Sequence, residues 1–245
     1  MILPVYRLTL RALLLQRRTI MLAVVVLAPV ATSLIYALAR PGGSDTVDFY
    51  SGIVQKLFVP AVAALVALVF GVSAFGDERE DGTILYLVAT PQPRLELVVA
   101  KVAAAWTASL VLLVPSLVLS GLLGLGSAAS LRLIGWPLVG VVLASLAYCS
   151  ASSWLSLKTR RPVVIGVIYI LLWEGSVATY AASAAKLSIS AYGSAFVAHA
   201  LPQSAPPVAG LVPSALVLAA VVVLAAWGAA RSLAARSFRR SSWYG

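Results

Sequence analysis

Residues 216–227 read LVLAAVVVLAAW, a stretch without charged residues and without regular alternation of polar and apolar side chains. A transmembrane β-barrel is built from strands of about ten residues in which polar and apolar positions alternate. This stretch is apolar on every face. It lies within an uncharged run, 211–230, that matches the roughly 20 residues of a membrane-crossing helix. The stretch therefore predicts a helix inside a membrane.

The rest of the chain repeats this pattern. Of its 245 residues, 61% are hydrophobic and 11% are charged, whereas about 25% of residues are charged in soluble domains. Further uncharged runs occupy 19–39, 57–76, 102–131 and 133–157, and another at 162–185 is interrupted only by Glu174. We predict an all-α polytopic membrane protein, a single transmembrane domain with six spans. The predicted spans are 19–39, 53–75, 98–125, 133–157, 162–182 and 211–231.

The net charge of +10 at first suggests a nucleic-acid partner. With a cytoplasmic N-terminus, however, the cytoplasmic segments would be 1–18, 76–101, 157–161 and 231–245, and they contain 14 of the 18 basic residues. This asymmetry is what the positive-inside rule describes. We therefore predict that both termini are cytoplasmic, and we interpret the charge as a mark of orientation rather than of nucleic-acid binding.

Residues 1–18 are expected to form an amphipathic helix along the inner membrane surface. Its basic and apolar residues fall near different faces, with Arg7, Arg11 and Arg18 on one and Leu8 and Leu15 on another. The alternative is the start of a cleaved signal peptide. The apolar run 19–39 is longer than the usual ~7–15 residues of a signal peptide's apolar region, which favours an uncleaved first span.

The connection between the second and third spans, 76–94, reads GDEREDGTILYLVATPQPR and is the most polar stretch of the chain. Five of the eight acidic residues fall between Asp77 and Glu96. Asp81 or Thr83 can cap a short helix with an apolar strip, and the following prolines stop it. A solvated loop is the alternative, but an apolar strip on a short helix favours docking to a partner.

Glu174 is the one acidic residue inside a predicted span. An ionised, unpaired carboxylate there is costly, so we expect it to be protonated, hydrogen-bonded to a neighbouring helix, or facing a wet cavity. A functional role and a structural role both remain open. The segment 183–210 that follows is predicted to be an outer loop, either with short helices dipping into the outer leaflet or as an ordinary periplasmic connection.

The numbers, neighbours and predicted positions of the reactive residues argue against several kinds of chemistry. The chain has one cysteine, Cys149, and one histidine, His199, too few for a disulfide or for a zinc site made by protein ligands. None of the four lysines follows a glycine, as the lysine of a P-loop does. A serine protease using Ser73 and His199 would need them about 3 Å apart, whereas the predicted spans separate them by nearly the ~30 Å hydrocarbon thickness. We predict no catalytic, cofactor-binding or metal site.

The arrangement resembles the membrane subunit of ABC-2 type exporters. The shared features are a basic N-terminal surface helix, six spans with both ends inside, and a polar loop between spans two and three. The strongest local match runs from Glu78 to Arg94 and on to Lys101. It is similar to the family's pattern of an acidic stretch, Gly-Thr, an aliphatic patch, proline, a basic residue and a lysine entering the third span.

The resemblance implies that 76–94 is a coupling helix that docks into a separately encoded ATPase. The residues so implicated are Asp77, Glu78, Arg79, Glu80, Asp81, Gly82, Thr83, Ile84, Leu85, Leu87, Pro91 and Arg94. Two ATPase copies would bind ATP and Mg, a second permease copy or a paralogue would complete the complex, and the bilayer would be a prokaryotic plasma membrane. The alternatives are a haem-exporter-type permease subunit of cytochrome maturation and a non-transporting polytopic assembly factor.

Overall fold

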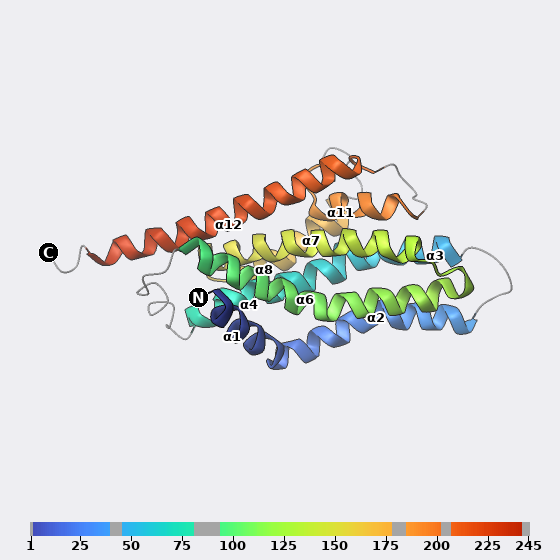
Figure 1. The fold of residues 1–245 in the computed structure, drawn as a ribbon, viewed down its shortest axis with the longest axis horizontal. Helices are drawn as coiled ribbons and strands as arrows, with labels where there is room; N and C mark the ends of the chain where they lie inside the picture. The colour runs from blue at the N-terminus through green and yellow to red at the C-terminus, as the bar shows by residue number, and fades with distance from the viewer. Residues whose placement is uncertain (1, 40–45, 81–93, 178–184, 202–206, 242–245) are drawn as a thin grey trace.

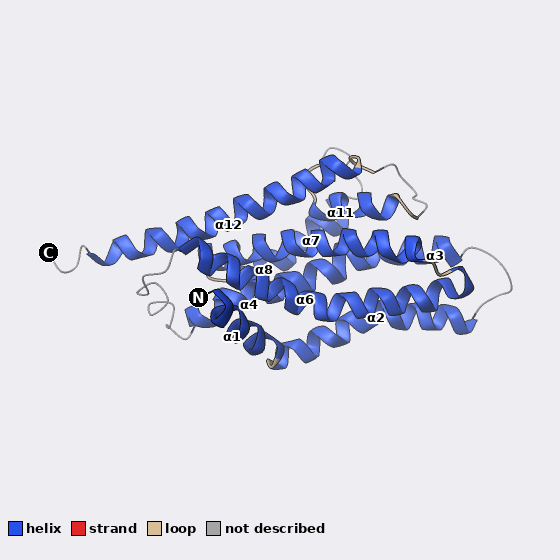
Figure 2. Cartoon of the chain, viewed as in Figure 1, coloured by secondary structure: helices blue, strands red, loops and turns tan. Residues whose placement is uncertain are grey.

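The structure is a computed structural model that describes residues 2–39, 46–80, 94–177, 185–201 and 207–241. Side chains are described for all of these except 2, 77–80, 175–177 and 235–241. Within these ranges the chain forms helices joined by short turns, and no strand is present (Figure 2). The predicted all-α class is confirmed.

Five helical segments of the described chain are long and apolar enough to cross a membrane, and they correspond to five of the six predicted spans. The second is a continuous run, Thr46–Gly76, built from α3 (Thr46–Ile53), η1 (Val54–Ala63) and most of α4 (Ala64–Glu80). The others are α2 (Arg17–Ala39), α6 (Arg94–Leu125) with η2 (Gly126–Ala128), α7 (Leu131–Lys158) and α12 (Leu211–Ser241).

The remaining predicted span, 162–182, begins as α8 (Pro162–Ile168) and continues as the wider π-helical turns of η3 (Tyr169–Val177). The α8 helix packs against α4, and η3 packs against η1, so this segment runs back along the second span in the opposite direction. Its apolar helix is shorter than the other five, and 178–184 lies outside the described residues. The sixth crossing therefore stays a prediction.

The long helices lie side by side in an elongated bundle (Figure 1). One end, which we call the α1 end, holds α1 (Ile2–Leu14), the end of α4 and the start of α6. The start of α1 and the end of α12 (Leu211–Ser241), which are the described ends of the chain, lie toward this end. The opposite end, the α11 end, holds α3 and the short helix α11 (Ile189–Ala198). The segment 76–94, from the end of α4 to the start of α6, thus joins two helices at the α1 end.

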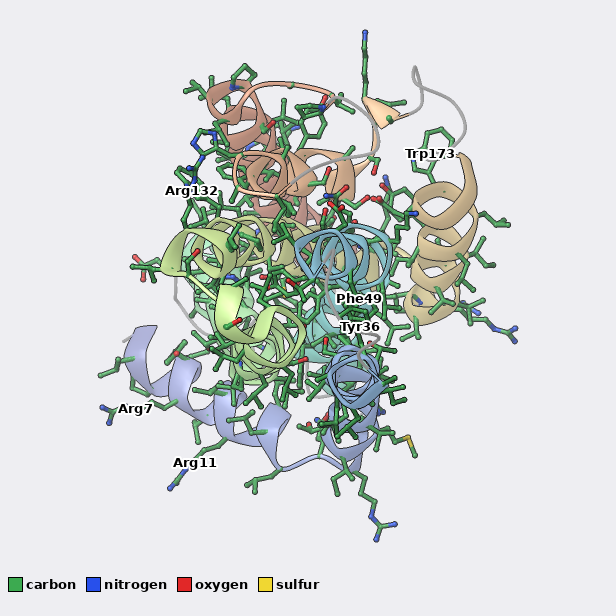
Figure 3. All side chains as sticks on the ribbon, turned by 90° about the vertical axis from the view of Figure 1, so that its right-hand side faces the viewer. Arg7, Arg11, Tyr36, Phe49, Arg132 and Trp173 are labelled. Atoms are coloured by element: carbon green, nitrogen blue, oxygen red, sulfur yellow. The ribbon has the colours of Figure 1, made fainter. Side chains whose placement is uncertain are left out.

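The predicted N-terminal helix ends at Leu14, and α2 begins after a short turn at Arg17. The α1 helix packs along α6, where the Tyr6 hydroxyl donates to Thr107 Oγ1 at 3.1 Å. Arg7 and Arg11 are exposed and point away from the bundle (Figure 3). A location at the membrane surface fits this arrangement and stays a prediction.

The α4 and α7 helices pack closely at the centre of the bundle. A Cβ atom on Gly71 would lie 2.0 Å from Ser152 Oγ and 2.7 Å from the Cys149 carbonyl oxygen. The Ser153 hydroxyl donates to the Gly71 carbonyl oxygen at 2.9 Å. Small residues and serine hydroxyls allow helix backbones to approach in this way inside a membrane.

Two contacts organise the α11 end. The rings of Tyr36 in α2 and Phe49 in α3 are stacked, with centroids 3.6 Å apart and planes inclined by 10° (Figure 3). A Cβ atom on Gly140 of α7 would lie 2.6 Å from the Gly193 carbonyl oxygen of α11. Glycine at position 140 therefore lets α11 lie directly against α7.

Candidate functional site

Glu174, in η3, is 3% exposed. Its carboxylate faces the start of α11, where the backbone amides of Ile189 and Ser190 donate to Oε1 at 3.0 Å and to Oε2 at 3.3 Å. The first amides of a helix have no partner within the helix, and the helix dipole favours negative charge at this position. Glu174 thus supplies acceptors to the first turn of α11 from another segment of the chain.

Three hydroxyl groups complete the coordination of the carboxylate. Tyr169 OH donates to Oε1 at 3.1 Å, and the hydroxyls of Ser188 and Ser190 both donate to Oε2. Ser188 is also the N-cap of α11, because its Oγ accepts from the amide of Ala191 at 3.3 Å. Five donors therefore converge on one carboxylate, which needs no cation nearby to satisfy its oxygens.

This geometry distinguishes between the environments that the sequence predicts for Glu174. Of the environments expected for a carboxylate inside a membrane, the structure shows hydrogen bonding to a neighbouring segment. The partners Tyr169, Ser188 and Ser190 were not among the predicted site residues. Serine is a common N-cap residue, so Ser188 before an apolar stretch is the feature of the sequence that could have indicated the start of α11. A role of Glu174 in transport stays a prediction.

An apolar groove of about 330 Å³ runs beside this cluster, between α7 and α8. Tyr169 and Ile189, two of the groups that donate to Glu174, line it together with Leu68, Leu155 and Ile170. The groove brings apolar surface close to the buried carboxylate.

Those predicted coupling residues that the structure describes lie at the other end of the bundle. Asp77, Glu78, Arg79 and Glu80 belong to the last turns of α4, and Arg94 is the first residue of α6. Asp81, Gly82, Thr83, Ile84, Leu85, Leu87 and Pro91 lie outside the described residues. Both flanks of the segment are thus continuations of long helices, and those helices pack against each other.

Lys101 connects these two helices. Its side chain is 1% exposed, and Nζ donates to the Ala74 carbonyl oxygen of α4 at 2.8 Å. The ammonium group also lies 4.9 Å from the centroid of the Phe75 ring, within the range of a cation–π contact. A buried lysine therefore joins α6 to the last turns of α4, just before the predicted coupling residues.

The serine and histidine considered as a protease pair are not together. Ser73, near the end of α4, accepts a hydrogen bond from Arg18 at 3.4 Å. His199 follows α11, with its ring edge-on to Trp136 at a centroid distance of 4.5 Å. The ends of α4 and α11 lie at opposite parts of the bundle (Figure 1), so the two residues do not form a nucleophile and base.

Residues 13–173 match the family model described as ABC-2 family transporter protein. The chain belongs to this family. The match runs from the end of α1 into η3 and includes the segment 76–94 and Lys101. It stops one residue before Glu174. No curated protein matches the chain.

Membership of the ABC-2 family and the apolar helices together show a multi-pass membrane protein. The family's members are the permease subunits of ABC transporters, typically without enzymatic activity, and they associate with an ABC ATPase subunit. The predicted resemblance is confirmed at this level.

Proposed function

We propose that this ABC-2 permease exports its substrate from the cytoplasm, driven by ATP hydrolysis in a separate ATPase subunit that docks on 76–94. The observation that carries the proposal is the place of this segment. It lies within the family match and joins two long, mutually packed helices at the α1 end. Four acidic residues and a strip of aliphatic residues within it suit an interface with a charged rim and an apolar centre.

The contacts around the segment support transmission of movement into the bundle. Because Lys101 ties α6 to α4, a displacement of 76–94 would move both helices together. The α1 helix also packs on α6 and would follow. Rigid-body movement of packed helices is an established way to change the access of a membrane cavity.

The proposed assembly contains two permeases and two ATPase subunits. Asp77, Glu78, Arg79, Glu80 and Asp81 would orient each ATPase, while Ile84, Leu85 and Leu87 would supply buried contact. ATP and Mg would bind to the ATPase. The complex would lie in a prokaryotic plasma membrane with both permease termini in the cytoplasm, as the distribution of basic residues predicts.

A cross-linking experiment tests this docking. The only cysteine, Cys149, is fully buried, so a Leu85→Cys variant adds a second thiol, within the proposed docking segment. In native membranes, a cysteine-reactive bifunctional reagent should join this variant to a subunit with a P-loop. A Leu131→Cys variant is the control, because Leu131 is 90% exposed and begins α7 at the α11 end.

The stoichiometry of the purified complex is the second measurement, and equal numbers of permease and ATPase chains are expected. Purification without any P-loop protein would favour an assembly factor and contradict the proposal. Equal cross-linking from Leu85→Cys and Leu131→Cys would contradict the assigned docking site.

A further inference from the structure

A second feature of the α1 end is a cleft of about 710 Å³ between α2, α4, the end of α7 and the start of α8. Its walls are largely aliphatic. They include Met21 and Leu22 of α2, Val69 and Val72 of α4, and Val163 and Val164 of α8. The volume is within the roughly 300–1,000 Å³ of sites that hold small molecules.

The charged side chains among the described residues that line this cleft are Arg18, Arg160 and Arg161, and all three are basic. Arg160 and Arg161 are exposed, next to the first turn of α8. Arg18 reaches across from α2 to α4, where Nη1 donates to Ser73 Oγ at 3.4 Å. Guanidinium groups present planar pairs of donors that match phosphate oxygens.

The cleft also opens onto exposed aliphatic surface of α2 and α8. Met21 is 71% exposed and Val164 is 52% exposed, although both line the cleft. The α2 helix is a candidate membrane span, and exposed aliphatic side chains on a spanning helix are expected to contact acyl chains rather than water. A ligand here would therefore meet guanidinium groups and a lipid-facing apolar wall together.

We propose that this cleft binds an anionic phospholipid, with its phosphate on Arg160, Arg161 and Arg18 and its acyl chains along the α2, α4 and α8 walls. A soluble anion would leave the apolar walls unused, and a zwitterionic lipid would place its ammonium group among the guanidinium groups. The cleft also reaches Ser73 and Gly76, so the lipid would contact α4 immediately before Asp77. The proposal goes beyond ATPase docking and does not require it.

The test uses the full chain, purified in detergent, depleted of lipid and titrated with dioctanoyl phosphatidylglycerol. Binding is measured by the shift of the melting temperature and by native mass spectrometry. Phosphatidylcholine of the same chain length and inorganic phosphate are titrated in parallel. Phosphatidylglycerol is expected to bind at least tenfold more tightly than either.

Arg160→Gln with Arg161→Gln is the decisive variant. Since each basic residue near a membrane contributes roughly a fivefold change in affinity for anionic lipid, the pair should weaken phosphatidylglycerol binding about 25-fold. The matched control is Arg7→Gln with Arg11→Gln, which removes two exposed arginines that point away from the bundle at the same end (Figure 3). The control should bind like the unmodified chain.

An equal loss in both double variants would indicate diffuse surface attraction and overturn the proposal. If inorganic phosphate binds as tightly as phosphatidylglycerol, the cleft is an ion site and the proposal is overturned. If phosphatidylcholine binds as tightly as phosphatidylglycerol, the cleft does not select an anionic headgroup, which also overturns the proposal. Loss of ATPase association with unchanged lipid binding would assign the cleft to the protein partner instead. A photoactivatable phosphatidylglycerol should label Met21 and Val163 in the unmodified chain, and absence of labelling there would overturn the proposal even if the double variant fails to fold.

Discussion

Lys101 of α6 donates a hydrogen bond of 2.8 Å to the carbonyl oxygen of Ala74 in α4, across the two helices that flank 76–94. A buried ammonium group is costly to desolvate, and the hydrogen bond to Ala74 offsets part of that cost for Lys101, which is 1% exposed. The contact joins the end of α4 to α6.

Lys101→Met tests this contact, because methionine preserves an unbranched apolar stem and removes the donor. A hydrogen bond from a charged group contributes about 1.5–3 kcal/mol, and relief of the buried charge offsets part of this loss in global stability. We expect a small change in melting temperature but roughly tenfold faster amide hydrogen exchange in the last turns of α4. Lys56→Met, at an exposed lysine in η1, is the control, and unchanged exchange in Lys101→Met would contradict the assigned role.

Glu174→Gln should destabilise the fold at the α11 end. Glutamine replaces one carboxylate oxygen by an NH2 group, which would face the backbone amide of Ile189 or of Ser190, and an amide N–H cannot accept a hydrogen bond. A buried donor without a partner costs about 1–3 kcal/mol, so we expect a loss of about that size in the free energy of unfolding. Denaturation of the purified chain measures it.

The control for this change is Glu96→Gln, at an exposed glutamate in the first turn of α6, which should lower the free energy of unfolding by no more than about 1 kcal/mol through the helix dipole. Equal stability of Glu174→Gln and the unmodified chain, together with impaired transport, would show that the carboxylate serves function rather than the attachment of α11.

Gly71→Ala should separate α4 from α7. The added Cβ would lie 2.7 Å from the Cys149 carbonyl oxygen, and overpacking of this kind typically costs about 1–3 kcal/mol. Gly135→Ala, in α7 with nothing within 4 Å of its Cβ position, should be neutral or stabilise by up to about 1 kcal/mol through helix propensity. The melting temperatures of the two variants measure the difference in stability. If Gly71→Ala melts at the same temperature as Gly135→Ala, α4 and α7 can move apart at little cost and the prediction is wrong.

Glu78→Lys combined with Glu80→Lys should weaken docking of the ATPase. Reversal of charges at the edge of an interface acts mainly on association rate and salt dependence, so we expect about tenfold weaker association at low salt and a smaller difference at high salt. Pull-down of the ATPase across a salt series measures this. Asp48→Lys, at an exposed residue of α3, is the control, and unchanged association with both glutamates reversed would remove these residues from the interface.

The helical class, five of the six predicted spans and the family could all be predicted from the sequence, while the span at 162–182 stays a prediction. These follow from local properties: a bilayer demands uncharged runs of a certain length, and the chain contains them at 19–39, 57–76, 102–131, 133–157 and 211–230. The clustering of acidic residues at 76–94 can likewise be recognised without knowledge of any tertiary contact. The position of Glu174 within an apolar run marked it as costly but did not name its partners.

The partners of the buried polar groups became visible only in the folded structure. The donors to Glu174 include Ser188 and Ser190, which lie 14 and 16 residues further along the chain. Lys101 accompanies cytoplasmic charges in the sequence, yet it is buried against Ala74. The three arginines of the cleft come from α2 and from the connection before α8. Hydropathy is a property of neighbours along the chain, so it can be read from the sequence. Hydrogen bonds and clefts depend on which helices pack together. That packing depends on contacts between residues far apart in the sequence, such as the close approach of α4 and α7 at Gly71.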